Sequence, residues 1–151
     1  MFVSTFRVLL LCVAAVLIAG CKSPPSGAEG SQAWVYLTNL SPGEITSATK
    51  DVFVREGYKV AKERPMEITF ERPGSVWDDL EQGGWDVGVT VRVQAILTPR
   101  GDDVYLLHCR ASLVRNPGDP VFEDPHSLTR LRRRPFQTLL DQVKTHLAVP
   151  P

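Results

Sequence analysis

Two apolar alternations separated by a short turn are the feature that most restricts how this chain can fold. Between residues 87 and 97 every second residue is Val, Ala or Leu. A second alternation runs from Tyr105 to Leu113, after the turn-forming residues 99–103 (PRGDD). A repeat of two is the side-chain period of a strand with one buried face. The two segments therefore predict an antiparallel hairpin, with one face against a core and the other face more polar.

Two other segments predict amphipathic helices. In the first, Ser41 is placed as the N-cap, with Pro42 at the first helical position and Glu44 completing a capping box. Gly57 is placed to end this helix. The second is expected over residues 135–147, with its start at Pro135. The apolar residues at helical spacing are Ile45, Ala48, Val52 and Phe53 in the first helix, and Phe136, Leu139, Leu140, Val143 and Leu147 in the second.

Shorter strand patterns complete the element order. Residues 33–37 are aromatic and β-branched, residues 58–60 begin an extended segment, and residues 66–71 alternate between apolar and polar side chains. Residues 75–84 are expected to form either a short capped helix or a surface connection. The order predicts one α+β domain over residues 33–151, a two-layer sandwich with a mainly antiparallel sheet and both amphipathic helices on one face.

The amino end carries an export pattern over residues 1–20. Residues 8–18 (VLLLCVAAVLI) form an apolar run of the length of a signal-peptide core, too short to span a bilayer. The four residues Ile18-Ala19-Gly20-Cys21 resemble the lipobox of bacterial lipoproteins. This resemblance implies cleavage before Cys21, a diacylglyceryl group on its thiol and an acyl chain such as palmitate on its amine. Several acyl chains together anchor a protein stably to a membrane.

The resemblance also suggests a cellular location and a role. Residues 21–32 are rich in Pro, Gly and Ser without periodicity, and we expect them to form a lipidated flexible tether. Lys22 stands where an aspartate retains enterobacterial lipoproteins in the inner membrane, which favours the outer membrane, facing the periplasm. The element order is similar to small α+β lipoproteins of envelope assembly, including the one that plugs the lipopolysaccharide translocon. That similarity implies a binding or assembly role and transfers no binding residues.

Composition and motifs point away from several classes of function. The chain has 17 basic and 17 acidic side chains, so no global field attracts nucleic acid. Cys109 is the one cysteine expected in the mature domain besides Cys21, and we expect it to be a buried small hydrophobe. The sequence shows no close spacing of histidines for a metal site and no nucleotide-binding or hydrolase motif. We therefore predict no metal, no cofactor and no enzymatic activity, and we interpret the acidic residues 78–81 as a solvated surface.

The candidate site is the basic run at residues 130–134 (RLRRR). Cations at a helix N-terminus oppose the helix dipole, so an acidic group is expected to offset them. That group is either internal, with Glu123 and Asp124 as the candidates, or external, as the phosphate of a lipid or an acidic protein partner. The candidate residues for binding an anion or a partner are Arg130, Arg132, Arg133 and Arg134.

The sequence therefore predicts a membrane-anchored envelope lipoprotein that binds a protein or a lipid without catalysis. The alternative is a small-ligand or lipid-binding domain with a pocket between the sheet and the helices. Such a pocket is expected to be lined by residues such as Trp77, Trp85 and Phe136.

Overall fold

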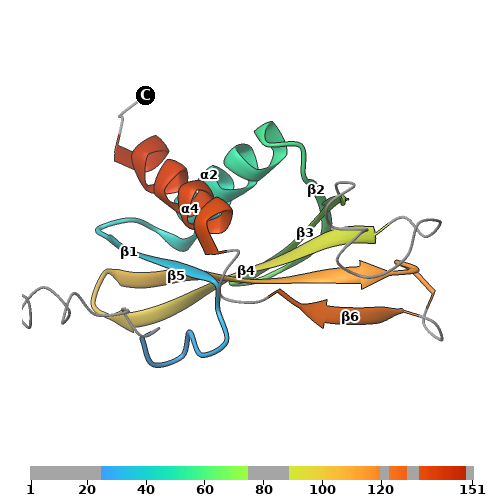
Figure 1. Ribbon diagram of the computed structural model, residues 1–151. Helices are drawn as coiled ribbons and strands as arrows, with labels where there is room; N and C mark the ends of the chain where they lie inside the picture. Colours follow the sequence, from blue (N-terminus) through green and yellow to red (C-terminus); the bar gives the residue numbers. More distant parts are fainter. Residues whose placement is uncertain (1–24, 75–88, 120–122, 129–132, 149–151) are drawn as a thin grey trace, which may run out of the picture.

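The computed structural model describes residues 25–74, 89–119, 123–128 and 133–148. They form an α+β fold with one six-stranded antiparallel sheet and two helices, as predicted (Figure 1). The expected signal peptide and the short helix expected from Ser75 lie outside the described residues. The elements are β1 (Ala33–Thr38), α2 (Pro42–Arg55), β2 (Lys59–Arg64), β3 (Glu67–Pro73), β4 (Val89–Gly101), β5 (Val104–Arg115), β6 (Asp124–Ser127) and α4 (Arg133–Ala148).

The predicted hairpin is the centre of the sheet. Strands β4 and β5 pair antiparallel over almost their whole length, and the main strand order is β1-β5-β4-β3-β2. The alternating residues of β4 are buried, from Val89 to Leu97, and the facing residues of β5 join them in the core, from Leu107 to Leu113. The hairpin confirms the period-two pattern, because each strand buries one complete set of alternate side chains.

Helix α2 begins as its capping residues predict. Ser41 Oγ accepts a hydrogen bond from the Glu44 backbone N–H, and the Glu44 carboxylate accepts one from the Ser41 backbone N–H at 2.8 Å. Gly57 follows the helix with φ of 85°, a conformation that glycine adopts without strain. The predicted apolar face is buried, and Phe53 stacks on Phe70 of β3 with ring centroids 4.4 Å apart.

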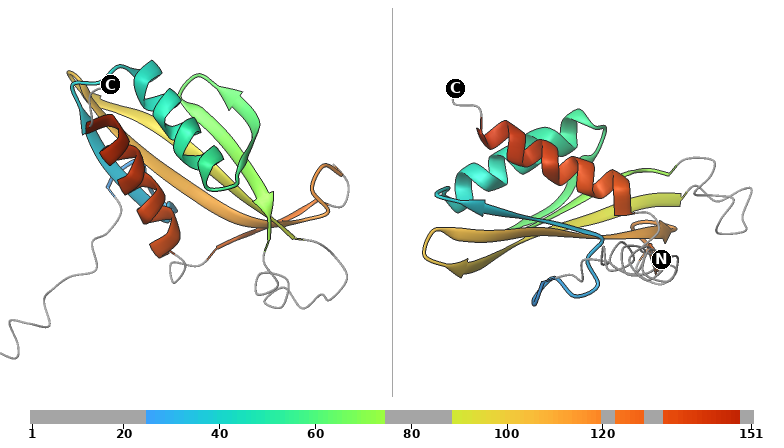
Figure 2. Two further views of the ribbon diagram at one scale, coloured as in Figure 1. Left: turned by 90° about the horizontal axis from the view of Figure 1, so that it is seen from above. Right: turned by 60° about the vertical axis from the view of Figure 1, so that its left-hand side comes forward.

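Both helices cover the same face of the sheet (Figures 1 and 2). Helix α4 begins at Arg133, two residues before the expected start, so that Pro135 lies in its first turn. It buries Phe136, Leu139, Leu140 and Val143 in the same core. Neither of the two described helices has the length and the hydropathy that crossing a membrane requires.

The second face of the sheet is less polar than predicted. Leu106, His108 and Val114 of β5 point away from the helices and are nonetheless buried. Residues 25–32 lie against this face, and Ala28 is completely buried there. The described part of the expected tether therefore makes contacts with the sheet that the prediction did not include. The segment docks through specific contacts that a composition-based argument does not detect.

One glutamine closes the outer edge of β5. Strands β1 and β6 both pair with this edge, β1 along one part and β6 along the other. Between them, the Gln32 side chain accepts a hydrogen bond from the Ala111 N–H at 2.7 Å and donates one to the Leu128 carbonyl at 2.9 Å. The Leu128 backbone N–H donates to the Ala111 carbonyl at 3.0 Å, and the Gln32 amide completes the pairing of this residue by satisfying its buried N–H group.

Candidate partner-binding surface

The structure describes part of the predicted basic run. Arg133 and Arg134 occupy the first turn of α4, and Arg134 is exposed. Cys21, Arg130 and Arg132 lie outside the described residues. The Arg133 guanidinium lies over the Trp34 ring, with its central carbon 3.9 Å from the ring centroid. Sequence reasoning missed Trp34 as a member of this surface, because the contact joins the first strand to the last helix.

A second residue of α4 fixes this arrangement. Gln137 accepts a hydrogen bond from the Trp34 N–H at 3.4 Å and donates one to the Trp34 carbonyl at 3.2 Å. These backbone groups point to the free edge of β1, which would otherwise present an unpaired donor and acceptor. The amide therefore caps the strand and holds the first turn of α4 beside the tryptophan.

The stack on Trp34 offsets the unfavourable interaction between Arg133 and the dipole of α4. A cation near a helix N-terminus costs about 0.3–1 kcal/mol. An arginine over a tryptophan face contributes about 0.5–2 kcal/mol. The two effects are of similar size, so the stack is sufficient to keep Arg133 where the dipole disfavours it. Stacking uses the guanidinium face and leaves its N–H groups in the plane, which is the geometry for binding a carboxylate or a phosphate.

The predicted internal partners are engaged elsewhere. Glu123 binds Arg92 of β4 through both carboxylate oxygens and also accepts a hydrogen bond from the Gly118 N–H. Asp124 pairs with His126 at 2.8 Å. Within the described residues, neither carboxylate contacts an arginine of the basic run. The interpretation of Glu123 and Asp124 as its neutralising groups is therefore not supported there.

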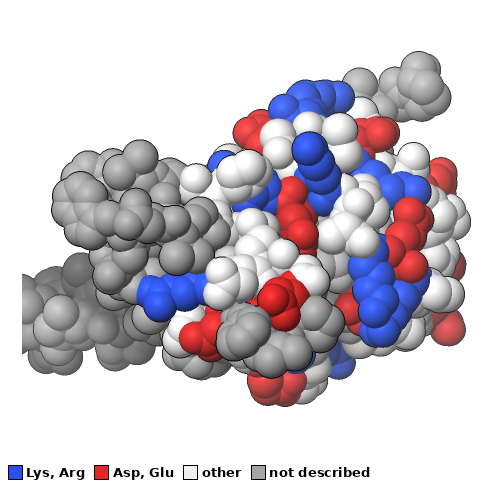
Figure 3. Space-filling view, turned by 90° about the vertical axis from the view of Figure 1, so that its right-hand side faces the viewer, with Lys and Arg blue, Asp and Glu red and all other residues white. Residues whose placement is uncertain are grey.

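Arg92 instead joins three parts of the fold. Its Nε donates to Glu71 of β3 at 2.6 Å, and its terminal nitrogens donate to Glu123 beyond β5. The hydrogen bond from Arg92, followed by that from Gly118, lowers the pKa of Glu123. Around this end of the sheet, basic and acidic side chains alternate on the surface, and no large area of one sign faces the viewer in Figure 3. The described surface there offers local charge pairs rather than a field.

The two residues with the most reactive side chains have structural roles. His108 is almost fully buried, and its ring nitrogens lie 2.8 Å from Ser31 Oγ and 3.2 Å from Thr98 Oγ1. Burial lowers the pKa of His108 to about 4, and the nearby Arg110 contributes in the same direction. Burial raises the pKa of Cys109 to about 12, so that its thiol stays protonated at neutral pH. Neither group is prepared for acid–base or nucleophilic chemistry.

A small cavity lies between a helix and the sheet in the part of the chain that the structure describes. A cavity of about 10 Å³ lies between α2 and the sheet, bounded by residues such as Ile45, Met66 and Leu107. A volume of this size holds about one water molecule. Phe136, expected to line a ligand pocket, is buried in the core, while Trp77 and Trp85 lie outside the described residues. In the described ranges, no group of three or more His, Cys, Asp or Glu side chains could hold a metal ion.

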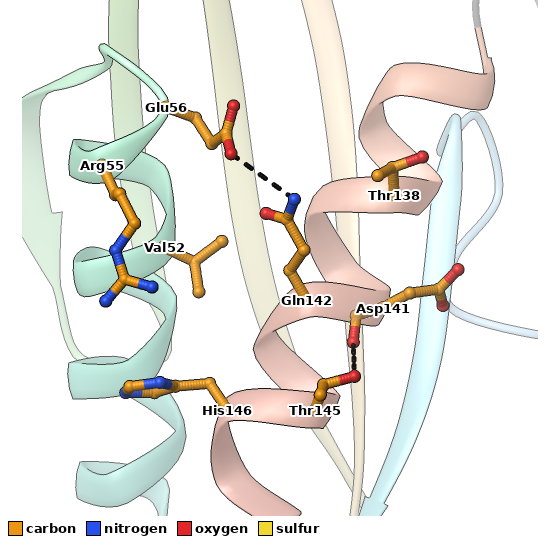
Figure 4. Close-up of a pocket in the computed structure, with 8 residues that line it drawn as sticks. All are labelled: Val52, Arg55, Glu56, Thr138, Asp141, Gln142, Thr145 and His146. Atoms are coloured by element: carbon orange, nitrogen blue, oxygen red, sulfur yellow. Dashed lines mark hydrogen bonds between the residues drawn. The ribbon is translucent and has the colours of Figure 1, made fainter.

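A larger hollow lies on the outside, between α2 and α4 (Figure 4). This groove has a volume of about 630 Å³ and is lined largely by polar and charged residues, although apolar atoms of their side chains contribute more of its surface than polar atoms do. Gln142 donates a hydrogen bond across it to Glu56 at 3.4 Å, and His146 lies 3.9 Å from Asp51 beside it.

No protein-family model and no curated protein matches the chain.

Proposed function

We propose that this chain is a bacterial envelope lipoprotein, anchored by acylated Cys21, whose α+β domain binds a protein or anionic lipid partner and performs no catalysis. The proposed location in the cell envelope rests on the apolar run that leads into Ile18-Ala19-Gly20-Cys21. By the same reasoning, cleavage removes residues 1–20 and the anchored protein lies at the outer membrane, on the periplasmic side.

The observation that carries the binding role is the Arg133 guanidinium stacked 3.9 Å from the Trp34 ring centroid. An aromatic ring that orients an arginine reduces the conformational entropy that the arginine loses on binding. Tryptophan and arginine are also the residue types that most often dominate the energetics of protein interfaces. The exposed Arg134 adjoins this pair, and Arg130 and Arg132 belong to the same basic run. The partner that fits is a carboxylate-rich protein surface or a lipid phosphate.

The small-ligand alternative receives less support from the described residues. A ligand pocket normally encloses several hundred cubic ångströms, whereas the cavity between α2 and the sheet measures about 10 Å³. The groove between α2 and α4 is large enough for a small molecule, but it is open on the surface of the domain and does not enclose a ligand between the sheet and the helices. We therefore place the binding function on the outer surface of the domain.

Crosslinking in intact cells tests the binding role. An Arg133→Ala variant and an Arg134→Ala variant each remove one charge, but only the first removes the stack on Trp34. We expect Arg133→Ala to lose most of the partner recovered with the native chain, and Arg134→Ala to lose less. Equal recovery from all three proteins, with unchanged urea unfolding midpoints, would contradict a role for the stacked arginine.

A separate fractionation tests the anchor. A Cys21→Ser variant has no thiol for acylation, and we expect it to leave the membrane fraction with its fold intact. If it stays with the membranes, another part of the chain holds the protein there.

A further inference from the structure

The segment that leads into the domain is fixed to the second face of the sheet, opposite the helices (Figures 1 and 2). Ala28 in this segment is fully buried, and Ser31 bonds the buried ring of His108 of β5 at 2.8 Å. Arg110 donates a hydrogen bond to the Glu29 carbonyl at 3.1 Å. The chain therefore enters the domain on the second face, and its first described residue, Pro25, belongs to this docked segment.

A short stretch of chain separates this segment from the expected lipid anchor. Pro25 follows Cys21 by four residues, and a chain of that length spans at most roughly 14 Å. Acyl chains on Cys21 lie in the bilayer, so its Cα stays near the headgroups. With an acylated Cys21, Pro25 would stay within that distance of the headgroups, which favours an orientation with the docked segment and the second face toward the membrane. A fully flexible tether over residues 21–32 would set no such limit on orientation.

The exposed and partly exposed side chains of this face suit a membrane surface. Tyr36 pairs in register with Leu106, and Trp34 pairs with His108, so both aromatic side chains lie on the second face. Tyr36 is 48% exposed, although it is a large aromatic residue on an otherwise ordered strand. Arg110, on the same face, is also exposed. Tyrosine and tryptophan concentrate at the headgroup level of membranes, and arginine binds lipid phosphates bidentately.

We propose that the second face of the sheet rests on the bilayer that holds Cys21, with Tyr36, Trp34 and Arg110 among the lipid headgroups. This orientation rests on the proposed acylation of Cys21. The helical layer then faces the aqueous compartment, and the groove between α2 and α4 is presented to soluble partners. In this orientation Arg133, stacked on Trp34, lies between the lipid headgroups and the aqueous compartment.

Position-specific quenching tests this orientation. The full protein, purified from membranes, is reconstituted into vesicles of phosphatidylethanolamine and phosphatidylglycerol that include a lipid with a nitroxide on its headgroup. Tyr36→Cys and Lys144→Cys variants carry a fluorescent label on the second face and on the exposed side of α4, respectively. Cys109 is buried and does not compete for the label, which the parent protein without an added cysteine verifies.

We expect the label at position 36 to lose most of its emission and the label at position 144 to retain most of it. Equal quenching at the two positions, or stronger quenching at 144, would overturn the orientation. If Tyr36→Cys does not fold, Arg110→Cys replaces it with the same expectation. Failure of the anchor itself is distinguishable, because a chain without acylated Cys21 would not float with the vesicles at all.

Discussion

Replacing Gln32 by alanine is expected to remove two hydrogen bonds at the outer edge of β5 and to destabilise the domain. The Gln32 side chain accepts the Ala111 N–H bond at 2.7 Å and donates to the Leu128 carbonyl at 2.9 Å, and the residue is only 6% exposed. Alanine leaves the buried Ala111 N–H without an acceptor, which costs about 1–3 kcal/mol. The Leu128 carbonyl is only partly buried, so water replaces its lost donor at little cost. We expect the free energy of unfolding to fall by about 2 kcal/mol.

Urea unfolding of the non-acylated Cys21→Ser protein measures this loss. With a denaturant slope of about 2 kcal/mol per molar, the midpoint should fall by about 1 M while the slope stays constant. Gln142→Ala is the matched control, because Gln142 is exposed and makes one long bond, at 3.4 Å to Glu56. We expect the control to change the free energy of unfolding by less than about 0.5 kcal/mol. A loss in Gln32→Ala no larger than that of the control would refute the bridging role of Gln32.

Three further predictions concern local features of the domain. Ser41→Ala removes the N-cap of α2 and should cost about 1 kcal/mol of unfolding free energy, whereas Ser47→Ala on the exposed side of the same helix should cost nothing measurable; equal losses would argue against the cap. The Cys109 thiol, with its pKa raised to about 12 by burial, should react with a thiol reagent only after unfolding, and rapid labelling of the folded protein would contradict its burial. His108, whose pKa burial lowers to about 4 from an ordinary 6.5, takes up a proton more readily in the unfolded chain, so its contribution to stability is complete above pH 6.5 and is lost as the pH falls toward 4. A His108→Gln variant should lose less stability than the native chain between pH 7 and pH 4.5, and identical losses would contradict this.

The layers of the fold follow from local patterns in the sequence. The hairpin of β4 and β5 is visible because alternate residues from Val89 to Leu97 are apolar, and a strand buried on one face imposes that period. Helix α2 is visible because Ser41 and Glu44 satisfy each other's backbone groups at its start. Signals of this kind need only a few neighbouring residues, so one sequence is enough to predict them.

The docked segment could not be predicted because its stability comes from distant partners. Residues 25–32 contain Gly and Ser, a composition typical of linkers, and only the sheet supplies the contacts that hold Ser31 and Gln32. The weaker alternation of β5 on its second face offered one indication. Leu106 and His108 are poor choices for a solvated face, and in the structure both are covered.

The candidate site was predictable as a run of arginines but not as a surface. Arg133 is placed by Trp34, about a hundred residues earlier in the chain, and Glu123 is occupied by Arg92 of β4. Charge pairs between strands and loops depend on register and on loop path, neither of which is encoded in nearby residues. For the two arginines that the structure describes, the contacts therefore do not support the neutralising groups proposed from sequence proximity.

The mass of the N-terminal peptide from protein purified out of membranes tests the central claim most directly. We expect a peptide that begins at Cys21 and carries a diacylglyceryl group and an acyl chain. A peptide that begins at Cys21 without lipid, or one that still contains residues 1–20, would contradict the lipid anchor and the membrane orientation that depends on it.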